Sequence, residues 1–206
     1  IEPHGGVLIN RVLEKIDSKE IEKLPELKVG ERVMLDCEQI ADGVYSPLQG
    51  FMTRDEIESV LEKYQLPNGD VWTLPIYLQT LESTAKHFKK GNMIALTDEI
   101  SGKRFATLNL EDVFNLDLEQ LAQKMFGTTS KDHPGVEQLY SGGNTFLGGK
   151  IELIEKLPKL GVIKSYILKP KDTRVIFEHK NWFRIVGFHT RNVIHKGHEF
   201  IQLKAL

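Results

Sequence analysis

The chain has 206 residues, 40% of them hydrophobic and 27% charged, which is typical of a globular protein with one large or two small domains. Its formal net charge of −2 provides no global basic field, so we expect neither nucleic-acid nor membrane-surface binding. A single cysteine, Cys37, cannot form an internal disulfide, and we therefore expect a cytoplasmic protein.

The first fifty residues carry short, mixed patterns. Apolar side chains at helical spacing predict a short helix around residues 12–16. Alternation over Gly30–Asp36 predicts a strand, and Asp42-Gly43 and Ser46-Pro47 mark turns.

A capping box marks the next helix. Thr53 and Glu56 can satisfy each other's free N–H groups at a helix start, and apolar residues then recur at helical spacing. The alternating run Val71–Leu81 contains Pro75, which predicts an edge strand or a bulge.

Strands dominate the following section. Gly91–Leu96 and Arg104–Leu110 predict a hairpin, and Leu116–Phe126 predicts an amphipathic helix. Gly127–Gly149 reads as a long loop with one short helix beginning at Pro134, which makes His133 a structural residue at a turn.

The polar, proline-containing stretch 169–172 predicts a boundary between two domains. Ile151–Leu157 and Val162–Leu168 precede it as apolar strand candidates, and Thr173–His179 follows it as a helix. The residues therefore predict a β-rich α+β domain followed by the opening of an α/β domain.

The last section has the order strand, polar loop, helix. Trp182–Phe188 is nearly continuous in apolar residues, as in a parallel strand buried on both faces. A polar turn over 189–192 follows, and Glu199–Leu206 predicts a helix. Since a helix N-terminus attracts anions, this order predicts an anion site, and we expect the anion to be a phosphate.

The start of that helix reads H-x-G-H over His195-Lys196-Gly197-His198. Two imidazoles on one helical turn can donate hydrogen bonds to phosphoryl oxygens, and Gly197 lets a phosphate approach the backbone. The pattern is also compatible with two surface histidines or with a metal pair, although zinc usually needs further ligands.

Residues 189–199 resemble the Q-T-R-N-P-x-H-x-x-H-E signature of the ATP sulfurylases, or sulfate adenylyltransferases. Further stretches resemble that family in the same order along the chain. They are Pro3–Gly6, Pro47-Leu48, Gly50–Met52, Trp72–Ile76, His133–Val136, Gly148–Lys150, Thr173-Arg174 and Trp182.

The resemblance implies a fold and a reaction. It implies an N-terminal PUA-like β-rich domain over residues 1–169 and, over residues 170–206, the truncated first units of a Rossmann-like nucleotidyltransferase domain. The reaction would be the formation of adenosine 5′-phosphosulfate and pyrophosphate from ATP and sulfate. The partners would be ATP, sulfate and further copies of the chain in a homo-oligomer.

The resemblance also assigns residues. It places catalytic roles on Thr190, Arg191 and Asn192, and sulfate binding on His189 and Arg191. It places ATP phosphate binding on His189, Arg191, Asn192, His195 and His198. No covalently bound cofactor and no metal held by the protein are expected, and Mg²⁺ should arrive with ATP.

Two residues depart from the signature: His189 stands in place of its glutamine and Val193 in place of its proline. These changes keep open a related nucleotidyltransferase with another acceptor. The family's later G-R-D-H-type segment is absent, so we expect residues 1–206 to be an N-terminal fragment that is inactive alone. A non-catalytic scaffold or oligomerisation fragment is the remaining alternative.

Overall fold

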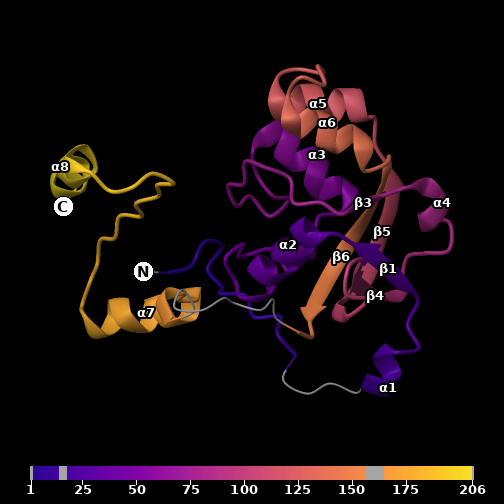
Figure 1. Cartoon of the computed structure of the whole chain (residues 1–206), viewed down its shortest axis with the longest axis horizontal. Helices are drawn as coiled ribbons and strands as arrows, with labels where there is room; N and C mark the ends of the chain where they lie inside the picture. The colour runs from indigo at the N-terminus through magenta and orange to yellow at the C-terminus, as the bar shows by residue number, and fades with distance from the viewer. Residues whose placement is uncertain (1, 14–17, 156–164, 206) are drawn as a thin grey trace. The chain divides into compact units, whose positions relative to one another are not determined.

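The computed structural model describes residues 2–13, 18–155 and 165–205 of the chain. It divides into two compact units, Glu2–Pro170 and Lys171–Leu206. We refer to these as the N-terminal and C-terminal units and describe each by itself (Figure 1).

The N-terminal unit contains both helices and strands, and two more helices, α7 and α8, follow. In order they are α1 Ser18–Ile21, β1 Glu26–Val29, α2 Glu31–Ala41, β2 Gly50–Phe51, α3 Arg54–Lys63, β3 Gln79–Thr80, α4 Glu82–Ala85, β4 Met93–Asp98, β5 Arg104–Asn115, α5 Leu118–Phe126, α6 Pro134–Ser141, β6 Thr145–Leu153, α7 Pro170–His179 and α8 Lys196–Ala205.

A six-stranded sheet organises the N-terminal unit. Its strand order is β1-β4-β5-β6-β2, with β3 also paired to β6. Only the β1–β4 pairing is parallel among these; the others are antiparallel. Strand β6 joins much of the sheet, because β2, β3 and β5 all pair with it (Figure 1).

Two glycines, Gly50 of β2 and Gly149 of β6, let the backbones of β2, β6 and β5 approach closely. A Cβ on Gly50 of β2 would overlap the carbonyl oxygen of Gly149, and a Cβ on Gly149 would overlap the carbonyl oxygen of Asn109 in β5. The register of β5 against β6 shifts between Leu110 and Asp112, beside this contact. Glycine therefore fits at both positions because side chains have no room there.

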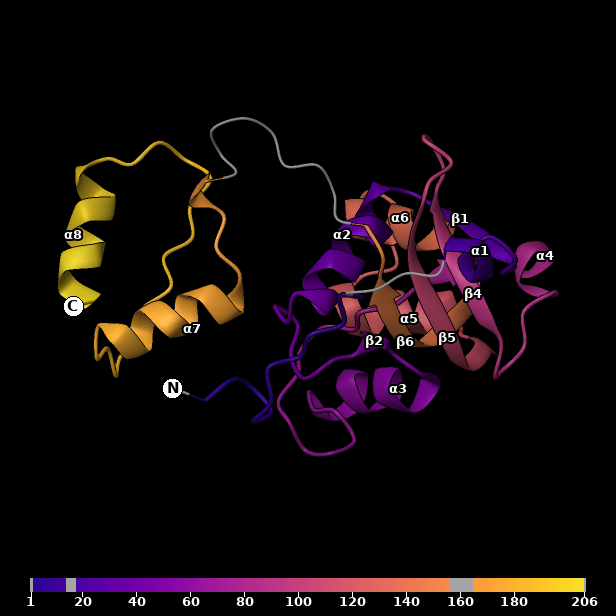
Figure 2. The same ribbon diagram turned by 90° about the horizontal axis from the view of Figure 1, so that it is seen from below.

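Two clusters of buried side chains form the core. One includes Cys37 and Ile40 of α2 together with residues of β4, β5 and β6, and Figures 1 and 2 show α2 beside β6. The other lies under α3, α5 and α6, which Figure 1 shows gathered at one end of β5 and β6. All the buried hydrophobic residues of the described chain fall between Leu27 and Leu153.

Helix starts follow the sequence closely. The capping box is confirmed, because the Glu56 carboxylate accepts from the Thr53 N–H at 2.8 Å and from its hydroxyl at 2.9 Å. The short helix at Pro134 is also confirmed, and His133 caps it by accepting from the Gly135 N–H at 3.2 Å. The predicted hairpin corresponds to β4 and β5, and the predicted helix Leu116–Phe126 corresponds to α5.

Two predictions in the first section are wrong. Gly30–Asp36 opens helix α2 rather than forming a strand, because buried Cys37, Ile40 and Ala41 extend a helical period that outweighs the short alternation. The apolar residues near position 12 do not begin a helix: Val12 bridges Leu153, and the Leu13 N–H donates to the Leu153 carbonyl. The rest of that predicted helix lies outside the described residues.

Loop and strand limits also differ from prediction in the middle of the chain. The run Val71–Leu81 is regular strand only at β3, and Val71 forms an isolated bridge with Gln65. The predicted loop Gly127–Gly149 ends earlier, where β6 begins at Thr145. Of the predicted strand Ile151–Leu157, residues 151–153 form the end of β6, residues 154 and 155 are not strand, and residues 156 and 157 lie outside the described residues. Within Val162–Leu168, the described residues 165–168 contain no strand.

The described residues of the C-terminal unit form no buried core. Helices α7 and α8 contain no buried residue, and Trp182–Phe188 is exposed along its length. The predicted buried strand is therefore wrong for this structure. A parallel strand requires hydrogen-bonded neighbours, and the described part of residues 171–205 has no strand to supply them. The described residues 171–205 therefore do not show Rossmann-like units.

Among the residues that the structure describes, no helix is both long and apolar enough to cross a membrane.

Candidate phosphate site at the start of helix α8

The two histidines of the H-x-G-H stretch lie together at the N-terminus of α8. Their ring centroids are 3.9 Å apart. Nδ1 of His195 accepts from the Gly197 N–H at 3.1 Å, and Nδ1 of His198 accepts from the His195 N–H at 3.3 Å. His195 is exposed and His198 is half-buried, so both rings are accessible to a ligand.

The turn that precedes the helix is held by its own threonine. The Asn192 N–H donates to the Thr190 hydroxyl oxygen at 3.0 Å. Thr190 is half-buried, whereas Asn192 is exposed. This turn holds the backbone of the segment through the Thr190 side chain. The side-chain amide of Asn192 is exposed and is accessible to a ligand.

The structure does not bring all six predicted site residues together. His189 and Arg191 are exposed on the turn. Within the described chain, no hydrogen bond or ion pair links either side chain to His195 or His198. The geometry thus gives two local pairs, Thr190 with Asn192 and His195 with His198, and leaves Arg191 as an exposed cation beside them.

The chemistry of this helix start favours an oxyanion. The positive end of the helix dipole lies beside two imidazoles at the start of α8. Arg191 and Lys196 add cationic side chains in the same short segment. Among the described residues, no group of three or more His, Cys, Asp or Glu side chains could hold a metal ion.

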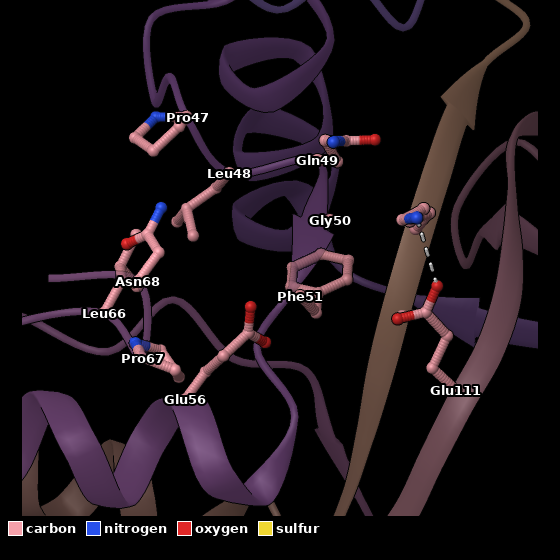
Figure 3. Close-up of a pocket in the computed structure, with 12 residues that line it drawn as sticks. Pro47, Leu48, Gln49, Gly50, Phe51, Glu56, Leu66, Pro67, Asn68 and Glu111 are labelled. Atoms are coloured by element: carbon pink, nitrogen blue, oxygen red, sulfur yellow. Dashed lines mark ion pairs between the residues drawn. The ribbon is translucent and has the colours of Figure 1, made fainter. Parts of the chain in front are cut away.

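A pocket of about 240 Å³ lies in the N-terminal unit and contains none of the predicted site residues (Figure 3). Glu111, which Figure 3 labels, forms an ion pair with Lys150, and the Lys150 Nζ lies 3.7 Å from the Glu111 Oε1. The Glu56 carboxylate also points toward the pocket, but it is already occupied by the helix cap at Thr53. The charged groups of Glu56, Glu111 and Lys150 that line this pocket therefore already have partners within the protein.

A second pocket, of about 330 Å³, belongs to the C-terminal unit. It lies between the end of α7 and the segment that follows, and is lined by Arg174, Phe177, Glu178, Asn181, Trp182 and Phe183. Arg174 and Trp182 were part of the family resemblance, but neither was predicted as a ligand-binding residue. Their convergence could not be read from the sequence, since it depends on the turn after α7.

Sequence reasoning also missed a cluster that Arg32 and Asp36 of α2 form with two tyrosines outside that helix. The Tyr45 hydroxyl donates to Asp36 at 3.4 Å, and the Arg32 guanidinium lies 5.6 Å from the centre of the Tyr77 ring. Burial raises the pKa of the Asp36 carboxyl, although Arg32 and the Tyr45 hydrogen bond lower it in part. Burial likewise raises the pKa values of Tyr45 and Tyr77. The wrong strand assignment for Gly30–Asp36 concealed this cluster.

Comparison with known protein families divides the chain at nearly the same place as the structure. Residues 1–156 match the PUA-like domain family, and residues 164–206 match the ATP-sulfurylase family. The resemblance read from the sequence is therefore confirmed.

Similar proteins extend over the whole chain. Sulfate adenylyltransferases of Persephonella marina and Thermococcus onnurineus are each 40% identical over 100% of the chain, but the matches cover 54% and 53% of those proteins. A solved structure described as a hexameric APS kinase from Thiobacillus denitrificans superposes with a TM-score of 0.75 and 29% identity, over 100% of this chain and 37% of that one.

The chain thus spans about half the length of the curated relatives it matches. It belongs to the PUA-like domain family over residues 1–156 and is, over its full length, a homologue of the sulfate adenylyltransferases.

Proposed function

We propose that this chain is the N-terminal half of a sulfate adenylyltransferase, which forms adenosine 5′-phosphosulfate and pyrophosphate from ATP and sulfate. The observation that carries the proposal is the histidine pair at the start of α8, in a segment that matches the ATP-sulfurylase family. Relatives with that activity in their names are 40% identical across the entire chain.

The reaction needs positioning more than covalent catalysis. A sulfate oxygen attacks the α-phosphorus of ATP, a new P–O bond forms, and the bond to the leaving pyrophosphate breaks in line. Negative charge gathers on phosphoryl and leaving oxygens during this step, so fixed hydrogen-bond donors accelerate it. No side chain has to act as a nucleophile.

Arg191 is proposed to bind sulfate. Its guanidinium presents a planar fork of donors that suits an oxyanion, and its exposed position leaves that fork available. His189, which stands where the family has glutamine, would add a second donor to sulfate or to a phosphate. Thr190 and Asn192 would orient the turn and the nucleotide, a role consistent with the hydrogen bond between them.

His195 and His198 are proposed to donate to phosphate oxygens of ATP and of the departing pyrophosphate. Magnesium would come bound to ATP, with the phosphates as its principal ligands.

The test separates the chain from the full-length protein. We expect sulfate-dependent release of pyrophosphate from ATP by the full-length protein and none by residues 1–206 alone. Turnover by residues 1–206 alone would refute the prediction that this fragment is inactive. If the full-length protein released no pyrophosphate in response to sulfate, the proposed reaction would be refuted.

The departures at His189 and Val193 favour one second candidate, a nucleotidyltransferase with another acceptor. Comparing adenylate formation with sulfate, phosphate and an organic phosphate distinguishes the two. His189→Gln restores the family's residue, so a rise in sulfate preference in this variant would assign acceptor choice to position 189.

The remaining assignments of partner and location are proposals of the same kind. The hexameric description of the structural relative supports a homo-oligomer, which light scattering on the full-length protein would measure. A cytoplasmic location is proposed on the single free cysteine, which is buried. The absence of nucleic-acid binding is proposed on the net charge of −2.

A further inference from the structure

The two histidines at α8 form a reciprocal helix cap. His195 immediately precedes the helix and its Nδ1 accepts from the Gly197 N–H at 3.1 Å. Three residues further on, Nδ1 of His198 accepts from the N–H of His195 at 3.3 Å. The pattern is that of a capping box, with imidazoles in place of the usual hydroxyl and carboxylate.

This geometry fixes where each ring carries its proton. A backbone N–H can only donate, so the Nδ1 atom that faces it must be an unprotonated acceptor. A neutral imidazole then has its single proton on Nε2. The cap therefore makes both rings Nε2–H donors and points their donor nitrogens away from the helix backbone.

Neighbouring groups hold the rings in this arrangement. The Phe188 ring meets the His198 ring edge to face, with centroids 5.6 Å apart. The His195 ring lies over Gly197: a Cβ at that position would be 3.0 Å from its Cε1 and 3.2 Å from its Nδ1. A side chain at position 197 would therefore press on the capping ring, which would have to shift by a few tenths of an ångström.

We propose that His195 and His198 position each other, through the reciprocal cap, as a pair of neutral Nε2–H donors for the oxyanion. The inference rests on the proposed function only in naming the anion as a phosphate. Protonation of either Nδ1 would remove an acceptor and open the cap, so the donor pair and the helix start are coupled.

The first experiment needs no nucleotide. In ¹⁵N-labelled chain of residues 1–206, long-range ¹H–¹⁵N correlations report the tautomer of each histidine. We expect a larger Nε2–H fraction for His195 and His198 than for His179, an exposed histidine in α7. Nδ1–H on either ring, or fractions equal to that of His179, would overturn the proposal.

Substitutions separate the cap from the donor. The oxygen of Asn can replace Nδ1, whereas the amide of Gln reaches the position of Nε2. In His195→Asn we expect the Gly197 amide to exchange with solvent as slowly as in the unchanged chain. In His195→Gln and His195→Ala it should exchange several-fold faster. Equal exchange in the Asn and Ala variants would contradict the cap.

The second experiment measures the affinity of the full-length protein for ATP. His195→Asn keeps the cap but lacks the outward donor, so ATP affinity should fall about tenfold or more. Fast Gly197 exchange in His195→Asn refutes the cap, and unchanged ATP affinity in that variant refutes the donor role. No ATP binding by the unchanged protein, with the tautomers as expected, would refute the proposed function and leave the cap standing.

Discussion

At the scale of single residues, Arg191 has the most direct bearing on substrate. It is exposed on the turn between Trp182–Phe188 and α8, in the segment that matches the ATP-sulfurylase family. In the full-length protein, Arg191→Ala should remove a charge-assisted hydrogen bond of about 1.5–3 kcal/mol. Turnover should then fall roughly ten- to a hundred-fold.

Arg191→Lys is the matched control. It keeps the positive charge and loses the planar fork, so it should recover only part of the rate. Initial rates of pyrophosphate release measure both variants. Full turnover in the alanine variant would exclude Arg191 from the reaction.

Two aspartates should affect stability with opposite dependence on pH. Burial raises the pKa of Asp36 above 3.8, so the folded state binds its proton more tightly and stability falls as pH rises through the interval above 3.8. Hydrogen bonds from Ser101 and Ile100 lower the pKa of Asp98 below 3.8, so the stability that it contributes is present above 3.8 and is lost as pH falls from 3.8 through the lowered pKa.

Melting temperatures across the acid range measure this difference. Asp36→Asn should weaken the decline in stability on raising the pH, because its amide oxygen can still accept from Tyr45 without a buried charge. Asp98→Asn should instead reduce the gain in stability between acid and neutral pH. Parallel pH profiles for the two variants would show that the environments of the two carboxyls do not differ in this way.

At the scale of elements, the close approach of β2 and β6 limits substitution at Gly50. A Cβ there would overlap the carbonyl oxygen of Gly149, so Gly50→Ala must separate the two strands. We expect the free energy of unfolding to fall by about 1–3 kcal/mol, as for other overpacked sites. Denaturant titration measures the change.

Gly187→Ala is the control for this substitution, since a Cβ at Gly187 meets nothing within 4 Å. It should leave the unfolding midpoint unchanged. Equal midpoints for the Gly50 and Gly187 variants would mean that the β2–β6 contact is not as tight as described.

The elements also show how far the sequence predicts this fold. Local chemistry was sufficient where residues close in sequence determine the structure, as at the Thr53–Glu56 cap and the His133-Pro134 helix start. It failed at Gly30–Asp36, because the apolar positions that decide between strand and helix lie beyond that window, at Cys37 and Ile40. Longer windows would have included them.

The candidate site was predictable in composition but not in geometry. The sequence placed His195 and His198 at a helix start, where the structure has them. It did not indicate that they cap the helix, because histidine is not among the residues that commonly do so. Trp182–Phe188 was predicted as a buried strand from its apolar residues alone, yet burial depends on neighbours that the described residues 171–205 do not provide.

At the scale of the whole molecule, the core lies entirely in the N-terminal unit. Every buried hydrophobic residue of the described chain is found between Leu27 and Leu153, whereas α7 and α8 bury none. A chain shortened to residues 1–170 should therefore keep the melting temperature and unfolding enthalpy of the 206-residue chain. Calorimetry on both chains makes the comparison.

A large loss of unfolding enthalpy on truncation would reveal a cooperative contribution from residues 171–206. The exposed apolar side chains of that segment, among them Phe183, Val186 and Leu203, should also make the longer chain bind a hydrophobic dye more strongly. The shorter chain therefore provides the baseline for that measurement.

The position of β6 sets an order of events during protein synthesis. This strand pairs with β2, β3 and β5, and its last residue, Leu153, bridges Val12, yet it is the last strand of the sheet to leave the ribosome. Long-range pairing of this kind is slow and cannot begin before both partners exist. In a nascent chain that stops before Thr145, β2 and β3 lack β6, the strand with which each of them pairs in the described structure. The sheet of the growing domain thus stays incomplete until β6 has been synthesised.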